Sequence, residues 1–133
     1  MKLGERLDRL PHAVELAALP LALLVVWLGS SIPSNSLPNL QIFSQDKLIH
    51  FMEYTGLGLA FWISGRRHWL RLLRSRCTTG FCVLTLGLVL PGALWAASDE
   101  FHQLFVGRDC SIWDWLADVC GLMLASWLVR KSV

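Results

Sequence analysis

The sequence predicts an all-α membrane protein with four transmembrane helices in an antiparallel bundle and both termini in the cytoplasm. Of its 133 residues, 54% are hydrophobic and 17% are charged, whereas about 25% of an ordinary soluble domain is charged. The apolar residues also fall in long runs, close to the roughly 20 residues that a helix needs to cross a bilayer. A chain of this length is expected to form a single domain.

Four apolar runs are predicted to span the membrane, approximately 13–32, 48–64, 80–104 and 112–129. The first run has the basic start of a signal peptide, but Glu15 and Pro20 interrupt it, so we expect a retained span. In the fourth run, Ala117, Gly121 and Ala125 recur every four residues. Small residues at this spacing favour close helix packing.

Basic residues set the predicted orientation, because short cytoplasmic loops are rich in lysine and arginine. The segment after the second run, interpreted as a loop, contains five arginines and no acid. With four spans, this loop and both termini lie on one side, and Lys47 and Arg108 are the two basic residues on the other. The cytoplasmic set is Lys2, Arg6, Arg9, Arg66, Arg67, Arg71, Arg74, Arg76, Arg130 and Lys131. The membrane topology accounts for the cluster of arginines after the second run, and the sequence contains no nucleic-acid-binding motif.

Three segments place polar side chains at the outer ends of the second, third and fourth spans. Spacings of three and four residues put most members of the first two segments on one helix face each, and Asp114 and Asp118 on one face of the third, whereas Arg108 lies in the loop before it. A charge at the centre of a membrane helix costs about 2.5–3.5 kcal/mol, so we expect these groups to face the bundle interior or a wet cleft. The residues are Asp46, Lys47, His50 and Glu53; Asp99, Glu100, His102 and Gln103; and Arg108, Asp114 and Asp118.

This constellation suggests both catalytic and binding roles. The catalytic candidates are His50 as general acid or base, with Glu100 or Asp118 tuning it. Lys47 and Arg108 are candidates to hold a phosphate or carboxylate of the ligand. The other candidates for substrate binding are Asp46, Asp99, Gln103 and Asp114. We predict no cofactor and no metal ligand set, but carboxylates beside a histidine suit a divalent cation, which stays an alternative.

The same three segments resemble the VanZ-like family of bacterial membrane proteins over roughly residues 46–121. The family pattern is D-K-x-x-H with an aromatic, then D-E-x-x-Q, then R followed by D-x-x-x-(N/D)-x-x-G. The matching residues are Asp46, Lys47, His50 and Phe51; Asp99, Glu100 and Gln103; and Arg108, Asp114, Asp118 and Gly121. Asp118 stands where many members have asparagine, which weakens any role that needs a neutral amide. Glu53 and His102 are outside the core pattern.

The resemblance implies a four-helix fold in the bacterial inner (cytoplasmic) membrane and a link to resistance to the glycopeptide teicoplanin. The expected partners are membrane lipids and a lipid-linked envelope precursor or glycopeptide. Three functions stay open: binding or modifying an envelope headgroup at the outer face, a structural or interaction role without catalysis, and a proton- or ion-coupled transporter. The sequence decides neither whether there is turnover nor whether the chain forms an oligomer.

Overall fold

All regular secondary structure in the described part of the chain is helical. The computed structural model describes residues 11–33, 43–74 and 78–132. These residues form the helices α2 (His12–Ser30), α3 (Phe43–Arg74), α4 (Thr78–Gln103) and α5 (Ile112–Ser132), and a short 3₁₀ turn, η2 (Leu104–Val106). No strand occurs in these ranges, so the predicted all-α class is confirmed.

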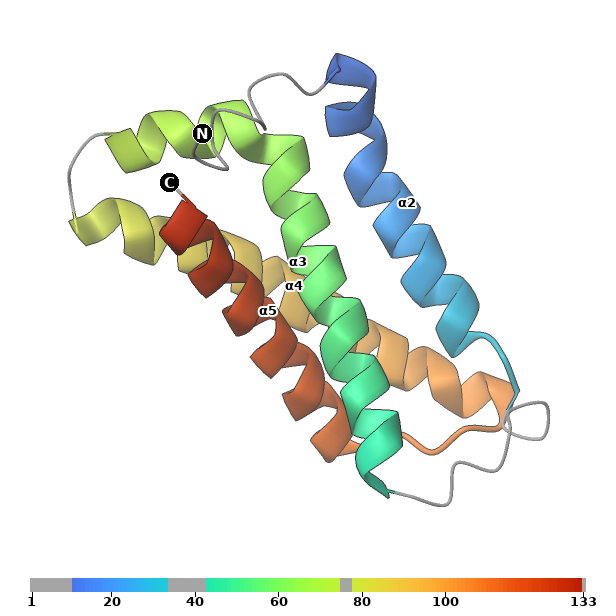
Figure 1. Ribbon diagram of the computed structural model, residues 1–133. Coiled ribbons are helices and arrows are strands. Elements are labelled where there is room, and N and C mark those ends of the chain that lie inside the picture. The colour runs from blue at the N-terminus through green and yellow to red at the C-terminus, as the bar shows by residue number, and fades with distance from the viewer. Residues whose placement is uncertain (1–10, 34–42, 75–77, 133) are drawn as a thin grey trace.

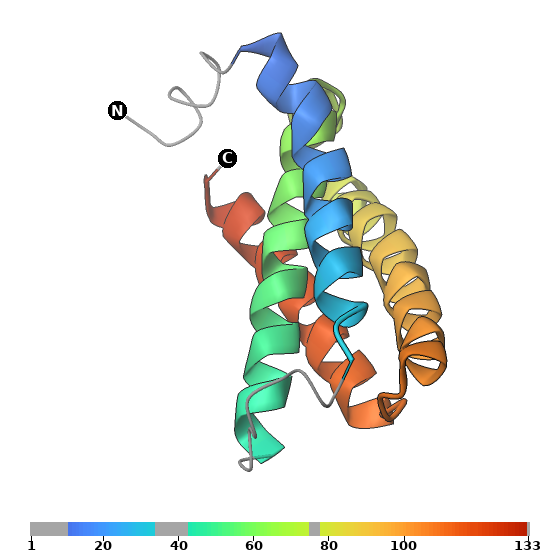
Figure 2. The ribbon, with the colours of Figure 1, turned by 90° about the vertical axis from the view of Figure 1, so that its right-hand side faces the viewer.

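Successive helices run in opposite directions (Figure 1). One end of the bundle, where α3 and α5 begin and α4 ends, carries Asp46, Glu100 and Asp114; we call it the polar end. The opposite end carries Arg66 and Arg130, and we call it the arginine end. α3 packs most extensively against α5, α2 lies mainly on α3, and α4 lies mainly on α5. Figure 2 shows α2 beside α3, with α4 running along the other side of α2.

Glycines bring α3 and α5 close together. A Cβ atom at Gly121 would lie 2.4 Å from the carbonyl oxygen of Phe51, so the backbones of the two helices are nearly in contact there. One turn further along α5, Ala125 lies against Gly58, whose added Cβ would be 2.6 Å from the alanine methyl. The predicted small-residue face at Gly121 and Ala125 therefore forms the α3–α5 interface.

The outside of the bundle is strongly apolar. Large hydrophobic side chains are exposed on all four α-helices and on η2, including Leu16, Met52, Leu94, Phe105 and Trp113. An ordinary soluble helix has one polar face, whereas a helix that is apolar all round is either buried or in a membrane. Two helices in the described ranges, at His12–Ser30 and Ile112–Lys131, are long and apolar enough to cross a membrane.

The arginine-rich segment was interpreted as a loop, and this is wrong for residues 65–74, which continue α3 as a helix. Figure 1 shows the last part of α3 turning across the arginine end. The pair Ser64–Gly65 precedes the arginines, and helices often kink at such pairs. After Gly65 the segment contains good helix formers, arginine and leucine. Residues 75–77, with Arg76, lie outside the described part, as do the N-terminal Lys2, Arg6 and Arg9.

A buried ion pair joins α2 to α3 at the arginine end. Arg66 Nη2 donates to Glu15 Oε1 at 2.7 Å, and both side chains are about 5% exposed or less. The more exposed Arg67 reaches the other Glu15 oxygen at 3.1 Å. Glu15 therefore has a partner on α3, although the sequence suggested only an interruption of the first span.

Candidate functional site

The polar end collects buried polar side chains from three helices. α3 and α5 begin there and α4 ends there, so residues far apart in the sequence share one level of the bundle. Each of these residues is at most 5% exposed. The buried set is His50, Asp99, Glu100, Gln103, Asp114 and Asp118, all of them predicted site residues.

At the centre of this set, His50 contacts Asp118. Its Nδ1 lies 3.0 Å from Asp118 Oδ1, and neither side chain is more than 5% exposed. Glu100 completes a triad, because ligand atoms of His50, Glu100 and Asp118 all lie within 4.8 Å of one another. The sequence left open whether Glu100 or Asp118 accompanies His50, and the structure brings both to it. The bonded partner is Asp118.

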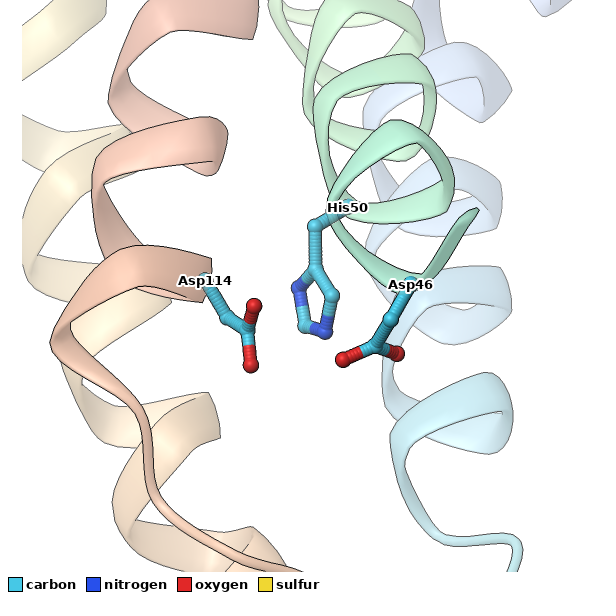
Figure 3. A group of neighbouring side chains, drawn as sticks. All are labelled: Asp46, His50 and Asp114. Carbon is cyan, nitrogen blue, oxygen red and sulfur yellow. The ribbon is translucent and has the colours of Figure 1, made fainter. Parts of the chain in front are cut away.

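Two ion pairs, each with at least one partly exposed side chain, lie beyond this triad toward the end of the bundle, and we call their position the entrance. Lys47 pairs with Asp114 across the α3–α5 interface, and Arg108 Nη2 lies 3.6 Å from Asp46 Oδ1. Figure 3 shows the imidazole of His50 between the carboxylates of Asp46 and Asp114. These three side chains form a second close group, with ligand atoms within 4.8 Å. Both bases predicted to hold a ligand are thus already paired with acids.

The loop between α4 and α5 fixes Glu100. Glu100 Oε2 accepts a hydrogen bond from the backbone amide of Ser111 at 2.8 Å, and the side-chain amide of Gln103 donates to Oε1 at 3.5 Å. Gly107 has a φ of 75°, a conformation that glycine adopts without strain. The next amide, of Arg108, then bonds back to the carbonyl of Gln103 at 3.0 Å. This turn brings the Arg108 side chain back to Asp46.

Asp99 is held from α2, by a residue that the sequence did not single out. Ser30 Oγ donates to Asp99 Oδ1 at 2.6 Å, and both residues are buried. His102 also faces α2, where it bonds Ser31 Oγ at 3.1 Å and stacks on Trp27. Asp99 therefore links the polar end to α2, and His102 lies apart from the triad, consistent with its place outside the core pattern.

Tyr54 is a further buried polar residue that the sequence analysis missed. It is fully buried one helical turn after His50, and its hydroxyl has no hydrogen-bond partner among the described residues. Oδ2 of Asp118 is likewise buried without a partner in the described ranges. The i, i+4 spacing from His50 is a signal that could have identified Tyr54.

An apolar cavity of about 180 Å³ adjoins the polar residues on the side of the arginine end. All four α-helices line it, and its lining is almost wholly apolar. Trp95 lies one turn before Asp99 in α4, and Leu122 lies one turn after Asp118 in α5, so polar cluster and cavity occupy consecutive layers. Further lining residues are Leu19, Leu57, Phe61 and Leu88.

Comparison with known proteins agrees with these motifs. The model of the VanZ/LLP1 family matches residues 13–132, which include α3, α4 and α5 completely and all of α2 except its first residue, His12. Searches of curated proteins and of solved structures gave no match. The family match covers nearly the whole chain and contains every predicted site residue. This chain therefore belongs to the VanZ/LLP1 family.

Proposed function

We propose that this protein binds the anionic headgroup of a lipid-linked cell-envelope molecule at the outer face of the bacterial cytoplasmic membrane. A single observation carries the proposal: a buried cluster of ionisable side chains directly adjoins an apolar cavity between the helices. A lipid has the same two parts, a polar head and a hydrocarbon tail. Ligand sites are typically apolar pockets with a few convergent polar groups.

The proposal includes four spans with both termini in the cytoplasm. The antiparallel order of the helices supports it, because the arginine end then collects the basic residues of the α3 C-terminus and of the α5 C-terminus. Positive charge on short loops favours the cytoplasmic side. The polar end faces outward in this arrangement.

In the proposed site, Lys47 and Arg108 are the groups that hold the headgroup. They lie at the entrance and exchange their present partners, Asp114 and Asp46, for a phosphate or carboxylate. Arginine suits this exchange because its planar guanidinium binds such anions with two parallel hydrogen bonds.

Group transfer or hydrolysis at this headgroup would use His50. When Asp118 is ionised, its bond to Nδ1 keeps the proton there and leaves Nε2 as the proton acceptor. An oriented imidazole of this kind is the usual arrangement of a general base. Binding without turnover uses the same residues, and a product assay with a labelled lipid phosphate separates the two cases.

A structural role is the second candidate, and the ion pairs at the entrance favour it because they satisfy Asp46 and Asp114 without a ligand. The ion relay is disfavoured. Leu57, Leu88 and Leu122 form a buried apolar layer between the polar end and the Glu15–Arg66 pair. A relay needs polar groups through that layer.

Native mass spectrometry of lipids that copurify with the protein tests the proposal. We expect an anionic envelope lipid on the wild-type protein and its loss from Arg108→Ala and Glu100→Gln. Asp109→Asn, in the exposed part of the same loop, is the matched control and retains the lipid. Equal lipid profiles in all variants, with folded yield lowered only in Arg108→Ala and Glu100→Gln, favour the structural role. Teicoplanin susceptibility of cells expressing each variant shows whether the ligand lies on the glycopeptide's target pathway.

A further inference from the structure

The polar end contains more carboxyl groups than basic side chains. Lys47 and Arg108 pair with Asp114 and Asp46 at the entrance, which leaves Glu100 and Asp118 deeper in the bundle beside His50. The contacts of Glu100 with Ser111 and Gln103 are to neutral amides. Burying a carboxylate is unfavourable unless a counter-charge or a metal accompanies it.

We propose that His50, Glu100 and Asp118 bind a divalent metal ion. Their ligand atoms lie within 4.8 Å of one another, and all three side chains are at most 4% exposed. Each comes from a different helix, so the site exists only in the folded bundle. Three protein ligands also leave coordination positions for water or substrate, which is the arrangement of catalytic metal sites. With the ion bound, His50 is a ligand and no longer a free proton acceptor, so a metal-bound water would take the place of the general base.

Two unpartnered atoms point independently to an occupant. Oδ2 of Asp118 and the hydroxyl of Tyr54 are both buried, and neither has a hydrogen-bond partner among the described residues. Tyr54 lies one helical turn after His50 on the same face of α3 and is fully buried. A metal ion would take the Asp118 oxygen as a ligand, and a water on that ion would bond the hydroxyl of Tyr54.

The donor set indicates which ions fit. One imidazole and two carboxylates suit Mn²⁺, Zn²⁺ and Mg²⁺, whereas thiolate ligands would favour softer ions. The second group, Asp46, His50 and Asp114, is a weaker candidate because both of its acids already have basic partners. We therefore assign the ion to the deeper triad.

The metal ion would also remove an electrostatic obstacle to headgroup binding. This consequence, unlike the metal site itself, rests on the proposed function. An anionic headgroup entering the polar end meets the carboxylates of Asp99, Glu100 and Asp118. A divalent cation among them attracts the phosphate and can bind one of its oxygens directly. Headgroup binding should then require the metal ion.

Mn²⁺ binding to the full chain tests the assignment. Protein is purified in detergent with EDTA, freed of chelator and titrated with Mn²⁺ under electron paramagnetic resonance detection. We expect a single Mn²⁺ per chain, with spin-echo modulation from an imidazole nitrogen. His50→Gln removes the modulation, whereas His102→Gln, at the histidine bonded to Ser31, keeps it. Glu100→Gln and Asp118→Asn weaken Mn²⁺ binding by at least about tenfold.

Absence of stoichiometric Mn²⁺ and Zn²⁺ binding would overturn the proposal, as would equal Mn²⁺ affinity in wild type, Glu100→Gln and Asp118→Asn. If Glu100→Gln and Asp118→Asn do not fold, the metal site is still tested by nitrogen modulation in the wild type, by its loss in His50→Gln and by its persistence in His102→Gln. A parallel titration with a short-chain polyprenyl phosphate, with and without EDTA, separates the two proposals. Mn²⁺ binding without phosphate binding sustains the metal site and contradicts the headgroup function. Phosphate binding that EDTA does not change, in a protein that binds no Mn²⁺, sustains the headgroup function and contradicts the metal site.

Discussion

Ser30 shows how a single hydroxyl joins a helix to the polar end. Its Oγ donates to the buried carboxylate of Asp99 at 2.6 Å, across the α2–α4 contact. α2 makes few other contacts with α4, so this bond has a large share in setting the position of α2 there. A buried acceptor that loses its donor bears the full cost of its desolvation.

Ser30→Ala should therefore lower the free energy of unfolding by about 1–3 kcal/mol. Ser98→Ala is the matched control, because Ser98 is exposed and its hydroxyl bonds only a carbonyl of its own helix, at Trp95. Unfolding of both variants in mixed micelles with increasing dodecyl sulfate measures the difference. Equal stability of the two variants would show that Asp99 finds another donor.

At this scale the sequence predicted which residues gather but not how they pair. The motif spacing placed His50, Glu100 and Asp118 together because each lies at a helix end on the same side of the bundle. It did not decide between Asp118 and Glu100 as the partner of His50, since that depends on a rotation of α5 against α3. Ser30 was missed because a single hydroxyl at the end of an apolar run has no distinctive pattern. Tyr54 was missed although its i, i+4 spacing from His50 places it on the same helix face.

Between elements, the α3–α5 contact determines the geometry of the triad. Gly121 lies three residues after Asp118, and its backbone approaches that of α3 at Phe51. Any side chain at position 121 would push the two helices apart and separate His50 from Asp118.

Gly121→Ala should accordingly destabilise the bundle by about 1–3 kcal/mol through overpacking and weaken ligand binding at the triad. Gly56→Ala is the control, since an added Cβ there meets no atom within 4 Å. Thermal unfolding in detergent compares the two. A Gly121→Ala protein as stable as Gly56→Ala would mean that α3 and α5 separate without cost.

The Glu15–Arg66 pair makes a corresponding prediction at the other end of the bundle. Arg66→Met removes the buried partner of Glu15 and leaves only the exposed Arg67 to pair with it. Breaking a buried pair lowers the free energy of unfolding by about 3–5 kcal/mol. Arg67→Met should cost at most about 1 kcal/mol, because exposed pairs contribute little. Unfolding in dodecyl sulfate ranks the two variants, and similar losses in both would contradict the distinction.

The helix boundaries agree with the sequence prediction where hydrophobicity was the signal used to predict them. The third and fourth apolar runs lie almost entirely within α4 and α5. The arginine segment was misjudged because positive charge was interpreted as a loop signal. Positive charge indicates on which side of the membrane a segment lies, but it does not argue against a helical conformation.

For the molecule as a whole, the proposed orientation can be tested through Cys110. It lies exposed in the loop between α4 and α5. In a variant without other cysteines, a membrane-impermeant maleimide should label Cys110 from outside intact spheroplasts. A cysteine introduced as Arg67→Cys in the same background should react only after lysis. Reversed labelling would invert the topology.

The labelling rate of Cys110 should also depend on pH. Partial desolvation and the nearby carboxylate of Glu100 raise the pKa of this thiol above its usual value. The thiolate is the reactive form, so labelling is slow at neutral pH and accelerates as pH rises toward that pKa. Glu100→Gln should lower the pKa and speed labelling at a fixed neutral pH, and an unchanged rate would contradict the influence of Glu100.

The central claim is that the polar end recognises the charged head of a lipid, and a matched pair of ligands tests it most directly. Isothermal titration of detergent-purified protein compares a short-chain polyprenyl phosphate with the polyprenol of the same length, which lacks only the phosphate. We predict that the phosphate binds at least about tenfold more tightly, a difference of about 1.4 kcal/mol, and that Arg108→Ala abolishes this preference. Equal affinities for phosphate and alcohol in the wild-type protein would contradict the account.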